Sequence, residues 1–239
     1  MDLIICFIDD SRFEHDLVHD EIAPYAPGIS FVQAYTFEEA RDVLKDRIPG
    51  LFLLDLWGQD PDVKNPSVTP KRELTESLNR VKTLDQVYDG LDDYKGDTTN
   101  EYLKRLFSIV DGWRKVFEGA CDRIGQNRKY GLGNLARARK FYPGVPSVFY
   151  TRKSLINDAV AMFDAGADGL FIKPTGRDDN ETRALTREYS CELVQKLTGI
   201  IDSKIEDLKT HRTFYMNEKG EIGIDIDELI SSWKEFINK

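Results

Sequence analysis

The sequence predicts an α/β fold, a doubly wound five-stranded parallel sheet with helices packed on it. Short apolar runs alternate with amphipathic helical stretches over the first 56 residues, and the alternation resumes near residue 129. Charged or hydroxyl side chains directly follow four of the apolar runs, which is typical of the edge where the carboxyl ends of parallel strands meet. The roughly 70 residues in between have helical periodicity only, so an insertion is expected to interrupt the sheet.

Residues 1–57 are expected to form the first part of the sheet domain. A helix is expected from Ser11 to about Ala23, where a proline follows. Thr36 and Glu39 form a capping-box pattern, which begins a second helix that reaches about Arg47. The strands predicted around these helices are Leu3–Ile8, Ile29–Ala34 and Leu51–Leu54.

Residues 58–128 are predicted to be an inserted αα-hairpin. After a proline-containing loop, apolar side chains recur at steps of three and four from Pro70 to Asp93, which predicts one long helix. The pattern Thr98-Thr99-Asn100-Glu101 is a second capping box and begins another helix that continues to Ile124. Helices of this length exceed a small α/β core, so the hairpin is expected to project. The seam between the two helices is expected to hold the aromatic side chains Phe107, Trp113 and Phe117.

The sheet domain is predicted to resume over residues 129–180. Two helices, Leu132–Phe141 and Ser154–Ala165, alternate there with two strands, Ser147–Tyr150 and Gly169–Ile172. Glycines near the helix ends supply the turns that this alternation needs.

Residues 181–239 are expected to be a C-terminal extension. A helix from about Asn180 to Lys209 is longer than the sheet can cover, so its second half needs another partner. The residues after it predict a small β-hairpin, Arg212–Met216 with Glu221–Ile226, and then a last helix.

Composition restricts the partners and the compartment. The net charge of −9 argues against a nucleic-acid-binding surface, which normally has a basic excess. Three widely spaced cysteines favour reduced thiols over a disulfide framework or a zinc site, as in a cytoplasmic protein. The N-terminus has no leader pattern, and no stretch approaches the ~20 apolar residues of a membrane span, so no membrane contact is expected.

Side chains at four predicted strand ends form a candidate site. Asp9 and Asp10 follow the first apolar run, Asp55 follows the third, and the last two runs end at Thr151 and Lys173. Clustered carboxylates suit Mg²⁺, which prefers oxygen ligands. A hydroxyl and an amine beside them suit the oxygens of a phosphoryl group. The set is therefore expected to bind a divalent cation and to receive a phosphoryl group.

These four motifs, in this order, resemble the receiver domain of two-component response regulators. The resemblance covers residues 1–56 and about 129–180, and it implies a flavodoxin-like fold. The segment Ala165–Gly169 followed by a strand and Lys173-Pro174 is its most specific part. The family pattern implies that the Lys-Pro peptide bond is cis and aims the amine into the site.

The resemblance also implies a role for each site residue. Asp55 would be the nucleophile that forms an aspartyl phosphate, while Thr151 and Lys173 neutralise the phosphoryl oxygens. The implied cofactor is Mg²⁺. Its implied protein ligands are Asp9, Asp10, Asp55 and the backbone carbonyl of Trp57.

The implied function is signalling. A histidine kinase or phosphotransfer protein would phosphorylate Asp55, and the phosphorylated state would change a protein–protein interaction. As an enzyme the chain would at most catalyse its own phosphorylation from small donors and its own dephosphorylation. The C-terminal extension lacks a helix-turn-helix pattern, so contact with a protein is the expected output, with a homodimer among the candidates.

Three features depart from the receiver pattern. Leu170 stands where the family usually has an aromatic switch residue. Arg152 follows Thr151, where small or acidic residues are common, and a basic side chain there is expected to stabilise the phosphate or slow its hydrolysis. The inserted hairpin begins within a few residues of Asp55, so its orientation is a candidate readout of the added charge.

Other interpretations stay open at this stage. The acids and Thr151 are also residue types that cap helices, and Lys173 is of a type usually solvated. A receiver fold also serves as a phosphorylation-independent interaction scaffold, although the intact site argues against that. HAD phosphatases use a strand-end aspartate as well, but Trp57 stands where they place a second acid. His15 and His19 have metal-ligand spacing, yet solvated surface positions are expected for both.

Overall fold

The structure is a computed structural model that describes residues 3–60, 62–152 and 156–211. The chain divides into two compact units. One joins the chain up to Gly58 with the chain from Arg128 onward, and the other is Gln59–Asn127. The first unit contains the sheet and the second is the insertion.

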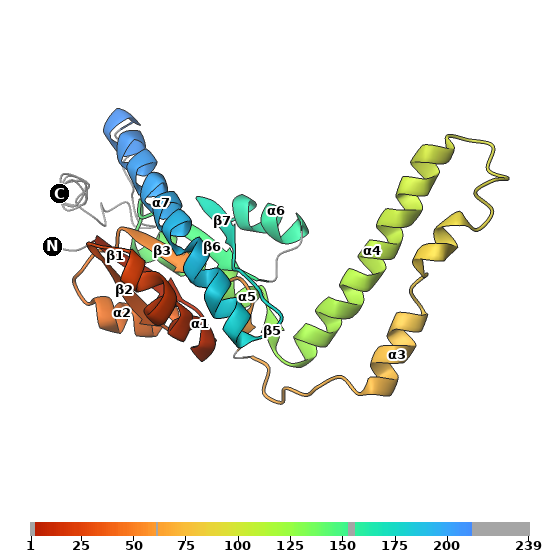
Figure 1. Ribbon diagram of the computed structural model, residues 1–239, viewed down its shortest axis with the longest axis horizontal. Helices are drawn as coiled ribbons and strands as arrows, with labels where there is room; N and C mark the ends of the chain where they lie inside the picture. Colours follow the sequence, from red (N-terminus) through yellow and green to blue (C-terminus); the bar gives the residue numbers. More distant parts are fainter. Residues whose placement is uncertain (1–2, 61, 153–155, 212–239) are drawn as a thin grey trace. The chain divides into compact units, whose positions relative to one another are not determined.

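Five parallel strands form the sheet in the order β2-β1-β3-β6-β7 (Figure 1). This order is that of flavodoxin-like doubly wound sheets, and it confirms the predicted fold class. The strands are β1 (Leu3–Ile8), β2 (Ile29–Ala34), β3 (Leu51–Leu54), β6 (Ser147–Thr151) and β7 (Gly169–Ile172).

The central strands are apolar because they are buried on both faces. Every residue of β1, β3 and β6 is buried. Parallel strands of this kind appear in sequence as continuous apolar runs rather than as alternating ones. The side chains of β7, which lies at one edge of the sheet, are only partly buried up to Phe171.

The helices of the sheet unit follow the predicted alternation. The first one begins as α1 (Arg12–Leu17), continues as the π-helical turn η1 (Val18–Ile22) and ends as the 3₁₀ turn η2 (Ala23–Tyr25). The others are α2 (Phe37–Leu44), α5 (Lys129–Phe141) and α6 (Ile156–Asp164). The cap of α2 is confirmed, because the Thr36 hydroxyl accepts from the Glu39 amide at 3.1 Å. The Glu39 carboxylate accepts in turn from the Tyr35 amide at 2.8 Å.

The last described helix, α7 (Asp179–His211), packs against η1 (Figure 1). Apolar side chains at steps of four, among them Leu193, Leu197, Ile201 and Ile205, are buried along it. Arginines at the start of α7 also bond Glu21, which is buried in η1. The β-hairpin and last helix predicted after residue 211 lie outside the described residues.

The inserted unit is helical, as predicted, but its first helix is shorter than expected. The chain enters and leaves it through β4 (Gly58–Gln59) and β5 (Gln126–Asn127), which pair as a two-stranded sheet. Between them lie α3 (Lys71–Asn79), the 3₁₀ turn η3 (Leu84–Tyr88) and α4 (Thr98–Arg123).

The prediction of one continuous helix over residues 70–93 is therefore wrong. The helix α3 ends at Asn79, and a capping box of Thr83 and Gln86 starts η3 four residues later. The periodic apolar residues continue through this break, because η3 still packs against α4. The predicted cap of the second helix is also off by one residue, since the side chain that accepts from the Asn100 amide at 3.0 Å is that of Asp97.

The predicted aromatic seam of the hairpin is wrong as well. Phe107, Trp113 and Phe117 are 70 %, 50 % and 42 % exposed. Ile109 of α4 is buried instead, and Gly112 of α4 packs against Val81. With only nine residues, α3 covers one face of a 26-residue helix and leaves the aromatic face open.

Within the described part of the chain, no helix is both long and apolar enough to cross a membrane. Cys6, Cys121 and Cys191 form no disulfide.

Candidate functional site

The sheet places the predicted site residues at one edge. The parallel ladder extends one residue beyond the strands, because the Asp55 amide donates to the Ile8 carbonyl at 2.9 Å and the Asp9 amide donates to the Ala34 carbonyl at 3.1 Å. The Lys173 amide similarly donates to the Thr151 carbonyl at 3.0 Å. The backbones that carry these side chains are thus fixed by the sheet rather than by loops.

Three carboxylates meet at this edge. Asp9, Asp10 and Asp55 each offer an oxygen, and these oxygens lie within 4.8 Å of one another. Asp9 and Asp55 are buried and Asp10 is half-buried. The Asp9 carboxylate is oriented by the Ser11 amide, which donates to it at 2.8 Å. Carboxylates this close repel each other unless cations lie among them, so their geometry suits a divalent ion.

Lys173 supplies one of those cations. Its amine is buried, donates to Asp9 through a short hydrogen bond, and lies 3.3 Å from an Asp55 oxygen. The structure corrects one expectation, since the peptide bond between Lys173 and Pro174 is trans. The position of Lys173, directly after β7 and beside Thr151, suffices to bring the amine to Asp55.

Burial and charge oppose each other in these side chains. Burial raises the pKa of Asp9 to about 7, although the charge of Lys173 acts to lower it. Burial likewise raises the pKa of Asp55, against the lowering effects of Lys173 and of the Thr151 hydroxyl. Burial alone would lower the pKa of Lys173, but the charges of Asp55, Asp9 and Glu14 raise it above its ordinary value. The amine is therefore held as a cation among carboxylates that are costly to ionise.

The hydroxyl of Thr151 is buried and has no hydrogen-bond partner of normal geometry in the described part of the chain. It nevertheless lies near enough to Asp55 to lower the pKa of that carboxyl. A buried hydroxyl without a partner is uncommon and calls for an explanation. An oxygen-rich group attached to Asp55 would provide the missing acceptor.

The backbone that follows Asp55 is tightly packed. The Leu56 carbonyl accepts from the Gly131 amide at 3.0 Å, and a Cβ built on Gly131 would lie 2.4 Å from the Asp55 carbonyl oxygen. Only glycine fits there, so the start of α5 holds the loop in place. Trp57 is buried in this loop. The role of its carbonyl as a metal ligand stays a prediction.

Two residues near the site were not expected there. His15 was expected at a solvated position and Glu14 was not predicted as a site residue, yet both are buried. His15 lies within hydrogen-bond distance of the Gln33 side chain, 2.8 Å, and of the Asp9 carbonyl, 2.9 Å. His19 is exposed, as predicted. Their position in the sequence could have indicated this, because the first helical turn after a strand-end acid lies at the same edge of the sheet as that acid.

Glu14 and Arg152 form an ion pair beside the site. The Arg152 Nε lies 2.8 Å from a Glu14 oxygen, and the other Glu14 oxygen is 3.5 Å from the Lys173 amine. Arg152 also donates to the Pro174 carbonyl and, at 3.1 Å, to the Thr175 hydroxyl. The effect of Arg152 on a phosphoryl group stays a prediction.

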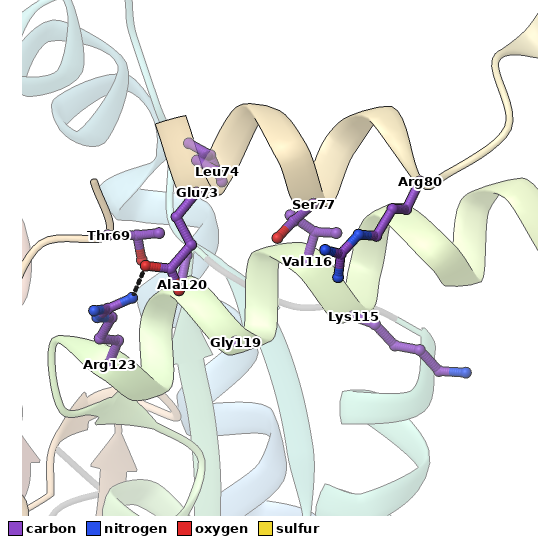
Figure 2. A pocket seen from close by; sticks show the side chains of 10 residues that line it. All are labelled: Thr69, Glu73, Leu74, Ser77, Arg80, Lys115, Val116, Gly119, Ala120 and Arg123. Atoms are coloured by element: carbon purple, nitrogen blue, oxygen red, sulfur yellow. Dashed lines mark ion pairs between the residues drawn. The ribbon is translucent and has the colours of Figure 1, made fainter. Parts of the chain in front are cut away.

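A hollow of about 390 Å³ lies elsewhere, between α3 and α4 of the inserted unit (Figure 2). Small residues such as Ser77, Gly119 and Ala120 leave this space, and an ion pair of 2.5 Å between Glu73 and Arg123 lies beside it. It contains none of the predicted site residues.

Solved structures with a similar fold are response regulators. A receiver domain protein described as CheY-like, from Methanospirillum hungatei JF-1, matches with 14% identity and a TM-score of 0.44, covering 87% of this chain and 99% of that one. A response regulator from Thermotoga maritima matches with 13% identity and a TM-score of 0.41, over 82% and 98% of the two chains. The receiver domain of NtrX from Brucella abortus matches with 18% identity and a TM-score of 0.37, over 79% and 98%.

No protein-family model matches the sequence, and no curated protein matches it either. TM-scores below 0.5 are weak likenesses, so the fold is assigned from the strand order itself. On that basis the flavodoxin-like fold that the resemblance implies is confirmed for the sheet unit, with the insertion between β3 and β6.

Proposed function

We propose that this protein is a phosphoacceptor of the response-regulator type, with Asp55 as the residue that is phosphorylated. The observation that carries the proposal is the surrounding of Asp55, where two further carboxylates and a buried amine converge with the buried Thr151 hydroxyl. That hydroxyl has no hydrogen-bond partner of normal geometry among the described residues. The carboxylates suit a cation, and the amine and hydroxyl suit phosphoryl oxygens.

In the proposed reaction an Asp55 oxygen attacks the phosphorus atom of a donor. A bond forms between that oxygen and phosphorus, while the bond from phosphorus to the donor's leaving group breaks and its electron pair departs with the donor. Lys173 and the Thr151 hydroxyl bind oxygens of the transferred group, which they can do without large movement because both are already buried beside Asp55.

A divalent cation fits the donor set that this chain provides. Asp9, Asp10 and Asp55 would hold Mg²⁺, with the Trp57 carbonyl as a further ligand, and the ion would supply positive charge for the phosphoryl oxygens. Binding would also remove the repulsion among the three carboxylates.

The proposed donor is a histidine kinase or a phosphotransfer protein, and the proposed output is a change in protein–protein contact. The added group carries about −1.5 to −2 charge. The exposed aromatic face of α4, with Phe107 and Trp113, is a candidate contact surface for a partner or for a second copy. A phosphatase of the HAD type is disfavoured, because buried Trp57 has no carboxylate to serve as the second acid.

The test is phosphorylation by acetyl phosphate with and without Mg²⁺, read on a phosphate-affinity gel. We expect a retarded band that requires Mg²⁺ and is absent from Asp55→Asn. Asp60→Asn is the matched control, because Asp60 is another buried aspartate, in the inserted unit, and its variant should still be phosphorylated. A band that persists in Asp55→Asn would contradict the proposal.

A further inference from the structure

Glu14 is a buried carboxylate that the proposed chemistry does not use. It lies between two cations, with one oxygen 2.8 Å from the Arg152 Nε and the other 3.5 Å from the Lys173 amine. Burying a carboxylate is costly unless cations and hydrogen bonds compensate it. Glu14 therefore depends on both cations, and one of them belongs to the phosphoryl site.

Arg152 connects Glu14 to the segment after β7. Its Nη1 donates to the Pro174 carbonyl and to the Thr175 hydroxyl, the latter at 3.1 Å. The next residue, Gly176, donates its amide to the Thr182 hydroxyl at 3.0 Å, in the first turns of α7. The second terminal nitrogen of Arg152, Nη2, is buried and has no hydrogen-bond partner in the described part of the chain. The Nη2 group of Arg152 is therefore an N–H donor that no described residue accepts.

These contacts form a continuous series from the phosphoacceptor to α7. Asp55 contacts Lys173, Lys173 contacts Glu14, and Glu14 contacts Arg152. Arg152 then holds the loop that leads into the helix. Leu170, which stands at the position of the usual aromatic switch residue, offers no polar group for such a connection.

We infer that Glu14 and Arg152 are positioning residues that couple the phosphoryl state of Asp55 to the loop of residues 174–176 and the start of α7. The inference rests on the proposed function. A phosphoryl group at Asp55 adds negative charge, so it draws Lys173 away from Glu14. Glu14 then keeps Arg152 as its main counter-ion. An ion pair is stronger than a hydrogen bond to a neutral acceptor. Arg152 therefore turns so that its Nη2 reaches the Glu14 oxygen that Lys173 has left, and this turn draws Nη1 away from the loop.

The experiment is amide hydrogen exchange of the full chain with Mg²⁺, with and without beryllium fluoride as a stable phosphoryl analogue. In the wild type, the analogue should increase exchange several-fold over residues 175–182. It should decrease exchange around Asp55. In Glu14→Gln and in Arg152→Gln the decrease around Asp55 should remain, while the response of residues 175–182 is lost.

Glu21→Gln is the matched control. Glu21 is another buried glutamate of the same helical segment, and it bonds Arg187 of α7 at 2.8 Å, away from the site. It should keep the wild-type response. A wild-type response in Glu14→Gln, or no response over residues 175–182 in a wild type that binds the analogue, would overturn the inference alone. Failure of the wild type to bind the analogue would overturn the proposed function and this inference with it.

Discussion

Several acidic side chains are buried at the site, although burial makes their ionised forms costly. Asp9, Asp55 and Glu14 lie around the amine of Lys173, and Asp10 lies beside Asp9 and Asp55. Burial raises the pKa of Asp9 and that of Asp55, so the ionised forms that bind a cation are the costly ones in the folded protein. Such carboxylates are typical of a binding site, where a ligand supplies the missing charge.

The first prediction concerns the pH dependence of stability without metal. The folded pKa of Asp9, about 7, is above its unfolded value of 3.8, so the native state binds the extra proton between these values. The free energy of unfolding should therefore fall as pH rises through this range, by up to about 1.4 kcal/mol per unit. Urea unfolding in EDTA at pH 5 and pH 8 measures this.

Asp9→Asn, which cannot ionise, should reduce that pH slope and be more stable than the wild type at pH 8. Adding Mg²⁺ at pH 8 should stabilise the wild type more than the variant, because the ion binds the ionised carboxylates. An equal slope in the two proteins would contradict the raised pKa of Asp9.

The second prediction concerns Gly131. Gly131→Ala places a Cβ 2.4 Å from the Asp55 carbonyl oxygen and 2.6 Å from the Leu56 Cα, both of which belong to the backbone. We expect a loss of about 1–3 kcal/mol in the free energy of unfolding and a weaker affinity for Mg²⁺, because the loop after Asp55 must shift.

Gly133→Ala is its control. A Cβ on Gly133 would meet nothing within 4 Å, and alanine favours a helix, so this variant should be neutral or slightly stabilising. Equal destabilisation by both variants would show that the close contact at Gly131 is not the cause. Denaturant midpoints and a Mg²⁺ titration of Gly131→Ala and Gly133→Ala measure the two effects.

At the scale of elements, what the sequence predicts best is the sheet. Buried parallel strands such as β1 and β3 have unbroken apolar runs, and their lengths match the prediction. The strand-end acids could be placed for the same reason. Glu14 and His15 could not, because helical periodicity distinguishes an apolar face from a polar one but not a solvated polar face from one turned toward a site.

The inserted helices show a different limit of prediction. Apolar periodicity continues through η3, so only local capping could reveal the break, and the Thr83–Gln86 box was hidden within a periodic stretch. Once α3 ends at Asn79, too little partner surface remains to cover both apolar faces of α4. The aromatic face is therefore exposed for a physical reason that follows from the length of α3.

The third prediction tests which face of α4 is the packed one. Ile109→Ala should lower the local stability of α4 by about 2–4 kcal/mol, because Ile109 is buried. Phe107→Ala should cost under about 1 kcal/mol, because that side chain is 70 % exposed. Amide exchange within residues 98–123 measures both. A larger loss of stability from Phe107→Ala than from Ile109→Ala would instead support the predicted aromatic seam.

At the scale of the whole molecule, a flavodoxin-like sheet unit carries a helical unit inserted after the loop that follows Asp55. The insertion leaves the site residues in one unit, since all of them lie before Gly58 or after Arg128. The proposed site residues therefore all belong to the sheet unit.

The central claim is that Asp55 accepts a phosphoryl group in this site. The most direct measurement is intact mass spectrometry after incubation with acetyl phosphate and Mg²⁺, followed by peptide mapping at acidic pH. We predict a mass gain of one phosphoryl group, located at Asp55, which EDTA prevents and which Lys173→Ala and Thr151→Ala reduce. An unmodified Asp55 under these conditions, or a phosphoryl group located at another residue, would contradict the account.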